Sequence, residues 1–169
     1  MKTAGAAALF FAFLFVGICA VREKRAKIRG LREICSALEI MYGELDARDP
    51  SIQELCRILC ERATGTAKQL FSCVHTLLPL LGEESFSSLW LRAVFVSCMD
   101  LDRCVIDELA ELGNALGRFD TRTQTRAIRT CIDRLSRRKE EMEKAFPGDR
   151  KLWLGLGAAV GALTAVMLI

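Results

Sequence analysis

The chain has 169 residues, of which 51% are hydrophobic and 27% are charged. The apolar share is too high for a disordered chain, and the charged share is too high for a polytopic transporter. The net charge is only +3, but residues 22–32 alone carry +5, directly after an apolar run. A basic excess confined to that position is typical of membrane topology and does not indicate nucleic-acid binding.

The first expected element is an apolar helix at the N-terminus. Residues 3–21 carry no charge, and a helix of that length rises about 28 Å, close to the thickness of the hydrocarbon core of a bilayer. A cleaved secretory signal is the alternative, because Lys2 supplies a short basic start. The apolar run is longer than a usual signal core, and bulky Ile18 stands where cleavage needs a small residue. We therefore expect residues 1–21 to be a retained transmembrane anchor.

Residues 22–151 are expected to form one all-α domain, a six-helix bundle. Apolar residues recur there at helical spacing, and no long stretch alternates with period two. A first stripe over residues 31–45 is continuous with the basic run. Ser51 and Glu54 have the spacing of a capping box that starts the second helix, and a third helix follows Gly65.

The last three helices of this domain differ in character. Residues 84–99 are apolar nearly all round, so the fourth helix must be enclosed by its neighbours or covered by a partner. Asp100 can cap the fifth helix, which Gly117 can close. Asp120 or Thr121 can start the sixth helix, which continues through a charged stretch towards the C-terminus.

Residues 152–169 form a second uncharged run and predict a C-terminal transmembrane helix. Gly157 and Gly161 lie four residues apart, a pattern that lets another membrane helix approach closely. Small residues are also simply common in membrane helices, and that is the explanation we favour.

The flanking charges predict the orientation of the chain. Only Lys2 precedes the first apolar run and six basic residues follow it, whereas the basic residues near the second run all precede it. Both patterns place residues 22–151 in the cytoplasm and both termini outside. Seven of the eight cysteines lie in this middle segment. An odd number does not suit a disulfide framework and agrees with reduced cytosolic thiols.

Residues suited to catalysis or metal binding are few. His75 is the only histidine, and the sequence contains no phosphate-binding glycine loop and no nucleophile elbow. Cys56, Cys60, Cys73 and His75 could together hold zinc, but Cys56 and Cys60 fall on an apolar helical stripe, where cysteine behaves as a small core residue. We expect no catalytic residue, no metal and no cofactor.

An arginine row is the first candidate for a partner interface. Arg118, Arg122, Arg126 and Arg129 lie close to one helical face, at spacings of four, four and three residues. They could meet an acidic partner, and the alternative is a solvated face.

The connection after the first helix is the second candidate interface. It carries Glu44, Asp46 and Asp49 against Arg48 alone, and it could attract a basic patch on a partner. The alternative is a solvated loop whose charges only keep the chain soluble.

Two short segments carry a family resemblance. Residues 112–120 are Leu-Gly-Asn-Ala-Leu-Gly-Arg-Phe-Asp, followed by Gln124, and residues 38–43 are Leu-Glu-Ile-Met-Tyr-Gly. They resemble the Leu-Gly…Leu-Gly-x-x-Asp-x-x-x-Gln signature and the Glu-Ile-x-Tyr segment of the stage III sporulation protein AB family. The matching positions are Glu39, Tyr42, Gly113, Gly117, Asp120 and Gln124. The family's Thr-Pro-Leu turn after the tyrosine is replaced here by Asp-Pro-Ser-Ile at residues 49–52, after a longer connection.

The resemblance covers nearly the whole chain and implies a function. Members are similar to the cytoplasmic helical domain of the inner-membrane platform protein of type II secretion and type IV pilus machines. The resemblance implies a non-enzymatic component of a mother cell–forespore complex in endospore formation, with a secretion-type ATPase and other membrane subunits as partners. In the secretion relatives this domain occurs twice, so its single occurrence here implies self-association. The alternatives are the platform protein of a non-sporulation secretion or pilus system, or a membrane-bound thiol or metal protein.

Asp120 and Gln124 are expected to act structurally at the start of the sixth helix. Asp120 can accept hydrogen bonds from the free amide groups there.

Overall fold

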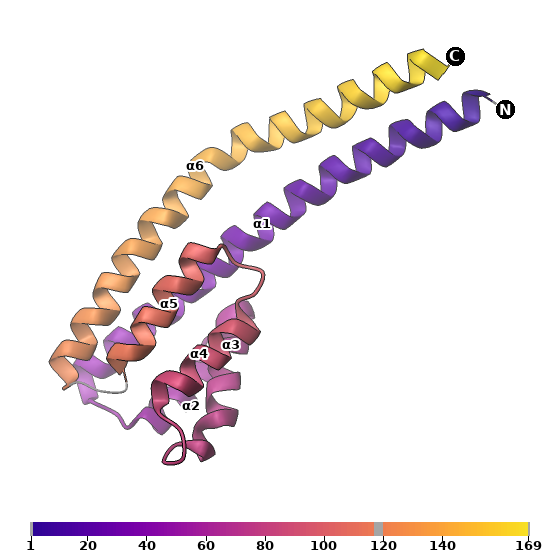
Figure 1. Ribbon diagram of the computed structural model, residues 1–169. Helices are drawn as coiled ribbons and strands as arrows, with labels where there is room; N and C mark the ends of the chain where they lie inside the picture. The colour runs from indigo at the N-terminus through magenta and orange to yellow at the C-terminus, as the bar shows by residue number, and fades with distance from the viewer. Residues whose placement is uncertain (1, 117–119, 169) are drawn as a thin grey trace. The chain divides into compact units, whose positions relative to one another are not determined.

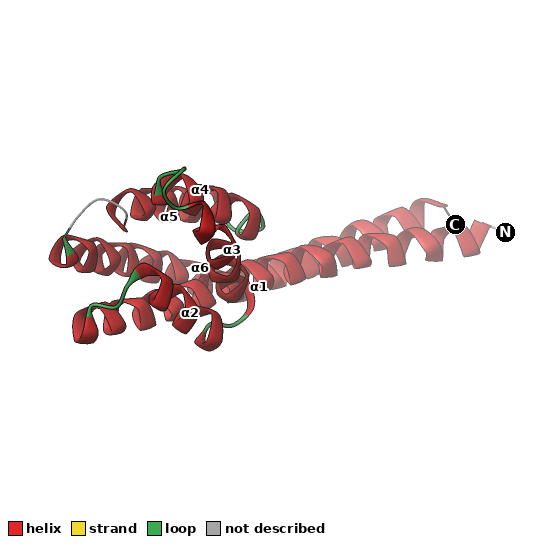
Figure 2. Cartoon of the chain, turned by 90° about the horizontal axis from the view of Figure 1, so that it is seen from below, coloured by secondary structure: helices red, strands yellow, loops and turns green. Residues whose placement is uncertain are grey.

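The computed structural model describes residues 2–116 and 120–168. Within those ranges the elements are α-helices and one short 3-10 helix, without a β-strand, which confirms the all-α class (Figures 1 and 2). The chain divides into two compact units. The first comprises residues 1–28 and 140–169, and the second comprises Arg29–Lys139.

The helices follow the order expected from the sequence. Their bounds are α1 (Lys2–Arg48), α2 (Ile52–Arg62), α3 (Gly65–Leu77), the 3-10 helix η1 (Leu78–Leu80), α4 (Phe86–Ser97), α5 (Arg103–Leu116) and α6 (Thr121–Leu168). The predicted start of the second helix is confirmed, because the Ser51 hydroxyl accepts a hydrogen bond from the Glu54 amide at 3.3 Å.

The fifth helix begins later than predicted. Asp100 is not its cap, because α5 starts at Arg103 and the Asp102 carbonyl accepts the first amides, from Val105 at 2.9 Å and Ile106 at 3.3 Å. The reason is the turn that buries Leu101, whose amide donates to the Cys98 carbonyl at 2.9 Å. Burial of one apolar side chain therefore outweighs the local capping preference of Asp100.

The core of the second unit is built around Trp90 of α4, which is 0% exposed. Its indole Nε1 donates to the Leu109 carbonyl of α5 at 2.6 Å, so the only polar atom of the side chain is satisfied. The rings of Phe71 and Phe86 lie 5.9 and 6.0 Å from it, between centroids. A Cβ at position 113 would collide with the Trp90 indole. Gly113 is therefore required for the close approach of α4 and α5.

A carboxylate from α1 fixes the start of α3. The Thr66 amide donates to Glu33 Oε2 at 2.8 Å, whereas the side chain at the helix N-cap, Thr64, makes no capping hydrogen bond. Gly65 has a φ of +53°, and a Cβ there would collide with the Glu33 carboxylate. This contact joins two helices far apart in sequence and satisfies one of the free amides at the helix start.

The first unit is a pair of helix ends. Residues 2–28 of α1 and 140–168 of α6 lie side by side in both views (Figures 1 and 2). The guanidinium of Arg25 lies 5.8 Å from the centroid of the Phe146 ring, within the range of a cation–π contact. Pro147 lies inside α6 without ending it.

The two predicted transmembrane helices are not supported. Within the described residues, no helix combines the length and the apolar character needed to cross a membrane. Most side chains of residues 3–21 and 152–169 lie outside the described residues. The division of the chain at residues 21 and 151 stays a prediction.

Candidate partner-binding surface

Within the second unit, the end of α1 is joined to the start of α6. The Thr121 hydroxyl donates to Asp49 Oδ1 at 2.9 Å, and Arg129 Nη1 donates to the Tyr42 hydroxyl at 3.4 Å. The Arg129 guanidinium also lies 5.5 Å from the centroid of the Tyr42 ring. Asp49 ends α1 with a φ of 47°, a left-handed conformation that aspartate tolerates better than most residues. These contacts hold two family-motif regions together.

A groove of about 650 Å³ runs between these two helix segments. Its charged lining consists of Asp46, Arg122, Arg126, Arg129 and Asp133. The hydrogen bond to Tyr42 is the main cause that raises the pKa of the Arg129 guanidinium, which therefore stays cationic. The groove carries more positive than negative side chains, so an acidic ligand suits it better than a basic one.

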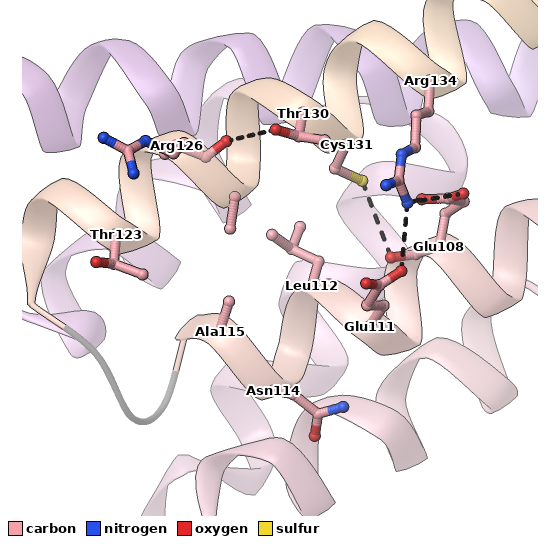
Figure 3. Close-up of a pocket in the computed structure, with 11 residues that line it drawn as sticks. Glu108, Glu111, Leu112, Asn114, Ala115, Thr123, Arg126, Thr130, Cys131 and Arg134 are labelled. Carbon is pink, nitrogen blue, oxygen red and sulfur yellow. Dashed lines mark hydrogen bonds and ion pairs between the residues drawn. The ribbon is translucent and has the colours of Figure 1, made fainter.

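A second groove, of about 400 Å³, lies on the other side of α6, against α5 (Figure 3). Arg134 binds Glu108 at 3.0 Å and Glu111 at 3.3 Å at one end of it, and these contacts raise the pKa of Arg134, mainly through the hydrogen bond to Glu108. Arg126 and Thr130 line both grooves. Arg126 therefore lies on an exposed part of α6 between the two grooves.

We call Arg122, Arg126 and Arg129, with the two grooves beside them, the arginine face. Arg122 and Arg126 are exposed, and within the described ranges neither side chain contacts an acidic partner. Arg118, the fourth member of the predicted row, lies outside the described residues. An uncompensated guanidinium pair in a concave setting is suited to binding carboxylates, because each guanidinium can donate two parallel hydrogen bonds.

The acidic side chains of the first connection are not gathered into one open patch. Glu44 is only 12% exposed and accepts from Arg62 at 2.8 Å, which joins α1 to α2. Asp49 is engaged with Thr121, as described above. Asp46 is exposed and lines the groove beside Arg122. Of the three, Asp46 is therefore the one placed to meet a partner directly.

The family-motif residues occupy different environments. Asp120 caps α6, because its side chain accepts from the Thr123 hydroxyl at 2.7 Å and its carbonyl accepts from the Thr123 and Gln124 amides, each at 3.0 Å. The Thr123 hydrogen bond is the main cause that lowers the pKa of Asp120. Glu39 is exposed, and Gly117 lies outside the described residues.

The residues that could have held zinc differ in their exposure to solvent. Burial raises the pKa of the Cys56 thiol to about 12, whereas His75 is exposed. Among the described residues, no group of three or more histidine, cysteine or acidic side chains has the arrangement of a metal site.

Sequence reasoning missed two features of the arginine face. The cation–π pair of Tyr42 with Arg129 joins residues 87 positions apart, and no local pattern indicates such a contact. Arg134 was not singled out, although Glu108 beside the apolar stripe of α5 is a signal for a nearby cation.

The family model of Stage III sporulation protein AB matches this chain over residues 2–169. The chain belongs to that family. A solved structure titled "Stage III sporulation protein AB" is similar to this family member with a TM-score of 0.64 and 18% sequence identity, over 72% of this chain and 97% of that one. At this identity the likeness shows a shared fold. No curated protein matches the chain.

Proposed function

We propose that this family member is a non-enzymatic platform component of the mother cell–forespore complex of endospore formation, and that it docks a cytoplasmic secretion-type ATPase through the arginine face. Family membership supports the sporulation setting over a general secretion or pilus system. The observation that carries the docking proposal is the exposed pair Arg122 and Arg126, which has no acidic partner among the described residues and lies beside two grooves.

The charges and spacing of the arginine face indicate what kind of ATPase segment can bind it. Arg122 and Arg126 are one helical turn apart, so carboxylates at a similar spacing on a partner helix can meet both. The grooves on either side accept the neighbouring side chains of that segment. Asp46 and Asp133 add two opposite charges to the lining of the groove, and such a mixed pattern favours a single orientation of the partner.

A platform role agrees better with the thiols than a membrane-bound thiol or metal protein does. Burial raises the pKa values of Cys56, Cys98 and Cys131 to about 12, so these thiols stay protonated at neutral pH. A nucleophilic or metal-binding cysteine acts as the thiolate. These three side chains are therefore suited to packing.

A location at the mother-cell membrane that faces the forespore is part of the proposal. It rests on the sequence: the apolar runs at 3–21 and 152–169 and the basic residues that follow the first and precede the second. Residues 22–151 should then resist proteases added to sealed cells, and both termini should be outside. Cleavage within 22–151 in intact cells would reverse this topology.

Self-association, the other proposed contact, is supported by the exposed apolar face of α4. Leu91, Phe95 and Val96 of α4, and Met99 just after its end, are 39–74% exposed. Large apolar side chains that are exposed near one another in sequence are often found at interaction sites. Sedimentation of the full chain should shift to a smaller species when Phe95 and Val96 are both changed to serine. An unchanged sedimentation coefficient would exclude this face.

The docking proposal is tested in sporulating cells with a tagged full chain as the sole copy. Arg122→Glu/Arg126→Glu should no longer co-purify the ATPase and should lower the spore count, at normal accumulation of the chain. The matched control is Arg57→Glu/Arg103→Glu, which makes the same charge change at two exposed arginines on α2 and α5. Equal ATPase recovery from both variants would contradict docking at the arginine face.

A further inference from the structure

The groove of about 400 Å³ between α5 and α6 has an apolar interior (Figure 3). Leu112 and Cys131, which are 3% and 4% exposed, line it together with the half-buried Ala115 of α5 and Ala127 of α6. Burial raises the pKa of the Cys131 thiol to about 12, so this sulfur stays uncharged at neutral pH. The alanines leave room that longer side chains would fill, and a cavity of this volume lies within the range of ligand pockets.

The two ends of this groove differ in charge. At one end, Arg134 is bound by Glu108 at 3.0 Å and Glu111 at 3.3 Å, so two carboxylates surround one guanidinium. At the other end lies Arg126, which has no acidic partner among the described residues (Figure 3). A carboxylate of a ligand is therefore attracted to the Arg126 end and repelled from the opposite one.

The hydroxyl groups around the groove already donate hydrogen bonds within the chain. The Thr123 hydroxyl donates to Asp120 at 2.7 Å, and the Thr130 hydroxyl donates to the Arg126 carbonyl at 3.0 Å. The Asn114 amide points away from the space between the helices (Figure 3). A polar group that entered the groove would lose hydrogen bonds to water without regaining them there, whereas an apolar group has none to lose.

We propose that the α5–α6 groove binds one large apolar side chain, a leucine, methionine or phenylalanine, of the ATPase segment whose carboxylates bind the arginine face. The inference rests on the proposed docking function and adds a second determinant of the segment. The apolar side chain displaces water from Leu112 and Cys131, while a carboxylate one helical turn away on the same segment meets Arg126. The charges then steer and orient the segment, and the buried apolar side chain supplies much of its affinity.

The experiment fills the groove without changing any charge. The Kd of the purified full chain for the purified ATPase is measured for Ala115→Leu and Ala127→Leu, which place a leucine in the groove from α5 and from α6. Each should raise the Kd at least about tenfold, because the partner's apolar side chain loses its site. Ala127→Val, which adds less volume, should raise the Kd about threefold. The fold increase should be the same at low and at high salt, because the charges remain in place.

The matched control is Ala110→Leu, the same substitution at a half-buried alanine of α5 that does not line the groove. Position 110 is five residues from position 115, about 140° around the helix. This variant should bind the ATPase within about twofold of the wild type.

Two results would overturn the groove proposal and leave docking at the arginine face intact. The first is wild-type affinity in all three groove variants while Arg122→Glu/Arg126→Glu has lost binding. The second is a loss in Ala110→Leu as large as that in the groove variants. Wild-type affinity in Arg122→Glu/Arg126→Glu would instead contradict the proposed docking function itself, and the groove proposal would fail with it.

Discussion

The α4–α5 interior and the arginine face lie in the same unit but differ in burial and in the pairing of their polar groups. In the interior, Trp90 is fully enclosed, its indole nitrogen donates to Leu109, and Gly113 leaves room for the ring. On the arginine face, Arg122 and Arg126 are exposed and have no acidic partner in the described ranges. The contrast indicates that stability and recognition are carried by separate residues. Substitutions in the interior should unfold the chain, and those on the face should leave it folded.

The largest expected difference is in thiol reactivity. Cys98 is 0% exposed and burial raises its pKa to about 12, whereas Cys104 is exposed. At pH 7, Cys98 should react with a maleimide at least about a thousandfold more slowly, because labelling requires opening of the fold. Site-resolved mass spectrometry measures both rates in one sample.

The raised thiol pKa also predicts the direction of the pH dependence. A thiol that is held neutral by the fold stabilises it below the unfolded pKa of about 8.5, and this stabilisation is lost as pH rises towards 12. For the labelling experiment on Cys98 and Cys104, the contradicting outcome is a comparable rate at the two thiols in the native chain, which would show that the interior is open.

Gly113→Ala tests the interior directly. The new methyl group collides with the Trp90 ring, so the free energy of unfolding should fall by about 1–3 kcal/mol. The matched control is Gly43→Ala, where a Cβ has no neighbour within 4 Å and alanine should raise helix stability by about 0.5–1 kcal/mol. Urea unfolding followed by Trp fluorescence gives both values. Opposite signs support the account, and a shared sign contradicts it.

The fold was largely predictable because the helices are specified by local sequence patterns. Apolar stripes locate the helices, and Ser51 and Asp120 cap α2 and α6 as their side chains predict. The start of α5 was missed because burial of Leu101 overrides the cap at Asp100. Local preferences thus fail where a tertiary contact competes with them.

The candidate site was predictable only in part. The arginine row follows from helical spacing, but its grooves depend on how α1 and α5 pack against α6. Charge counting placed Glu44 among the docking residues, although its salt bridge with Arg62 depends on a helix packing that no local pattern encodes. Gly113 was found through the family motif, and its physical reason appears only with Trp90 beside it.

Asp120→Ala should have a smaller effect at the edge of the arginine face. It removes the acceptor of the Thr123 hydroxyl, and the melting temperature should fall by several degrees at pH 7. Because the pKa of Asp120 is lowered in the folded chain, its stabilisation is present above the ordinary aspartate pKa of about 3.9 and is lost as pH falls through the lower folded value. Melting curves from pH 7 to pH 3 should therefore converge for variant and wild type. A constant gap down to pH 3 would exclude the charged cap.

The smallest expected effect on stability is that of Arg122→Glu/Arg126→Glu. Both side chains are exposed and without a described acidic partner, so the free energy of unfolding should change by no more than about 0.5 kcal/mol per site. Urea unfolding measures it. A loss comparable to that of Gly113→Ala would mean that these arginines hold the fold.

The most direct measurement of the central claim is the affinity of the purified full chain for the purified secretion-type ATPase. The wild-type Kd should rise with salt, and Arg122→Glu/Arg126→Glu should weaken binding at least about tenfold, since the reversed charges repel the acidic segment. Arg57→Glu/Arg103→Glu should bind within about twofold of wild type, because exposed ion pairs of this kind contribute little. Tight binding that is indifferent to salt and equal for the two variants would contradict docking through the arginine face.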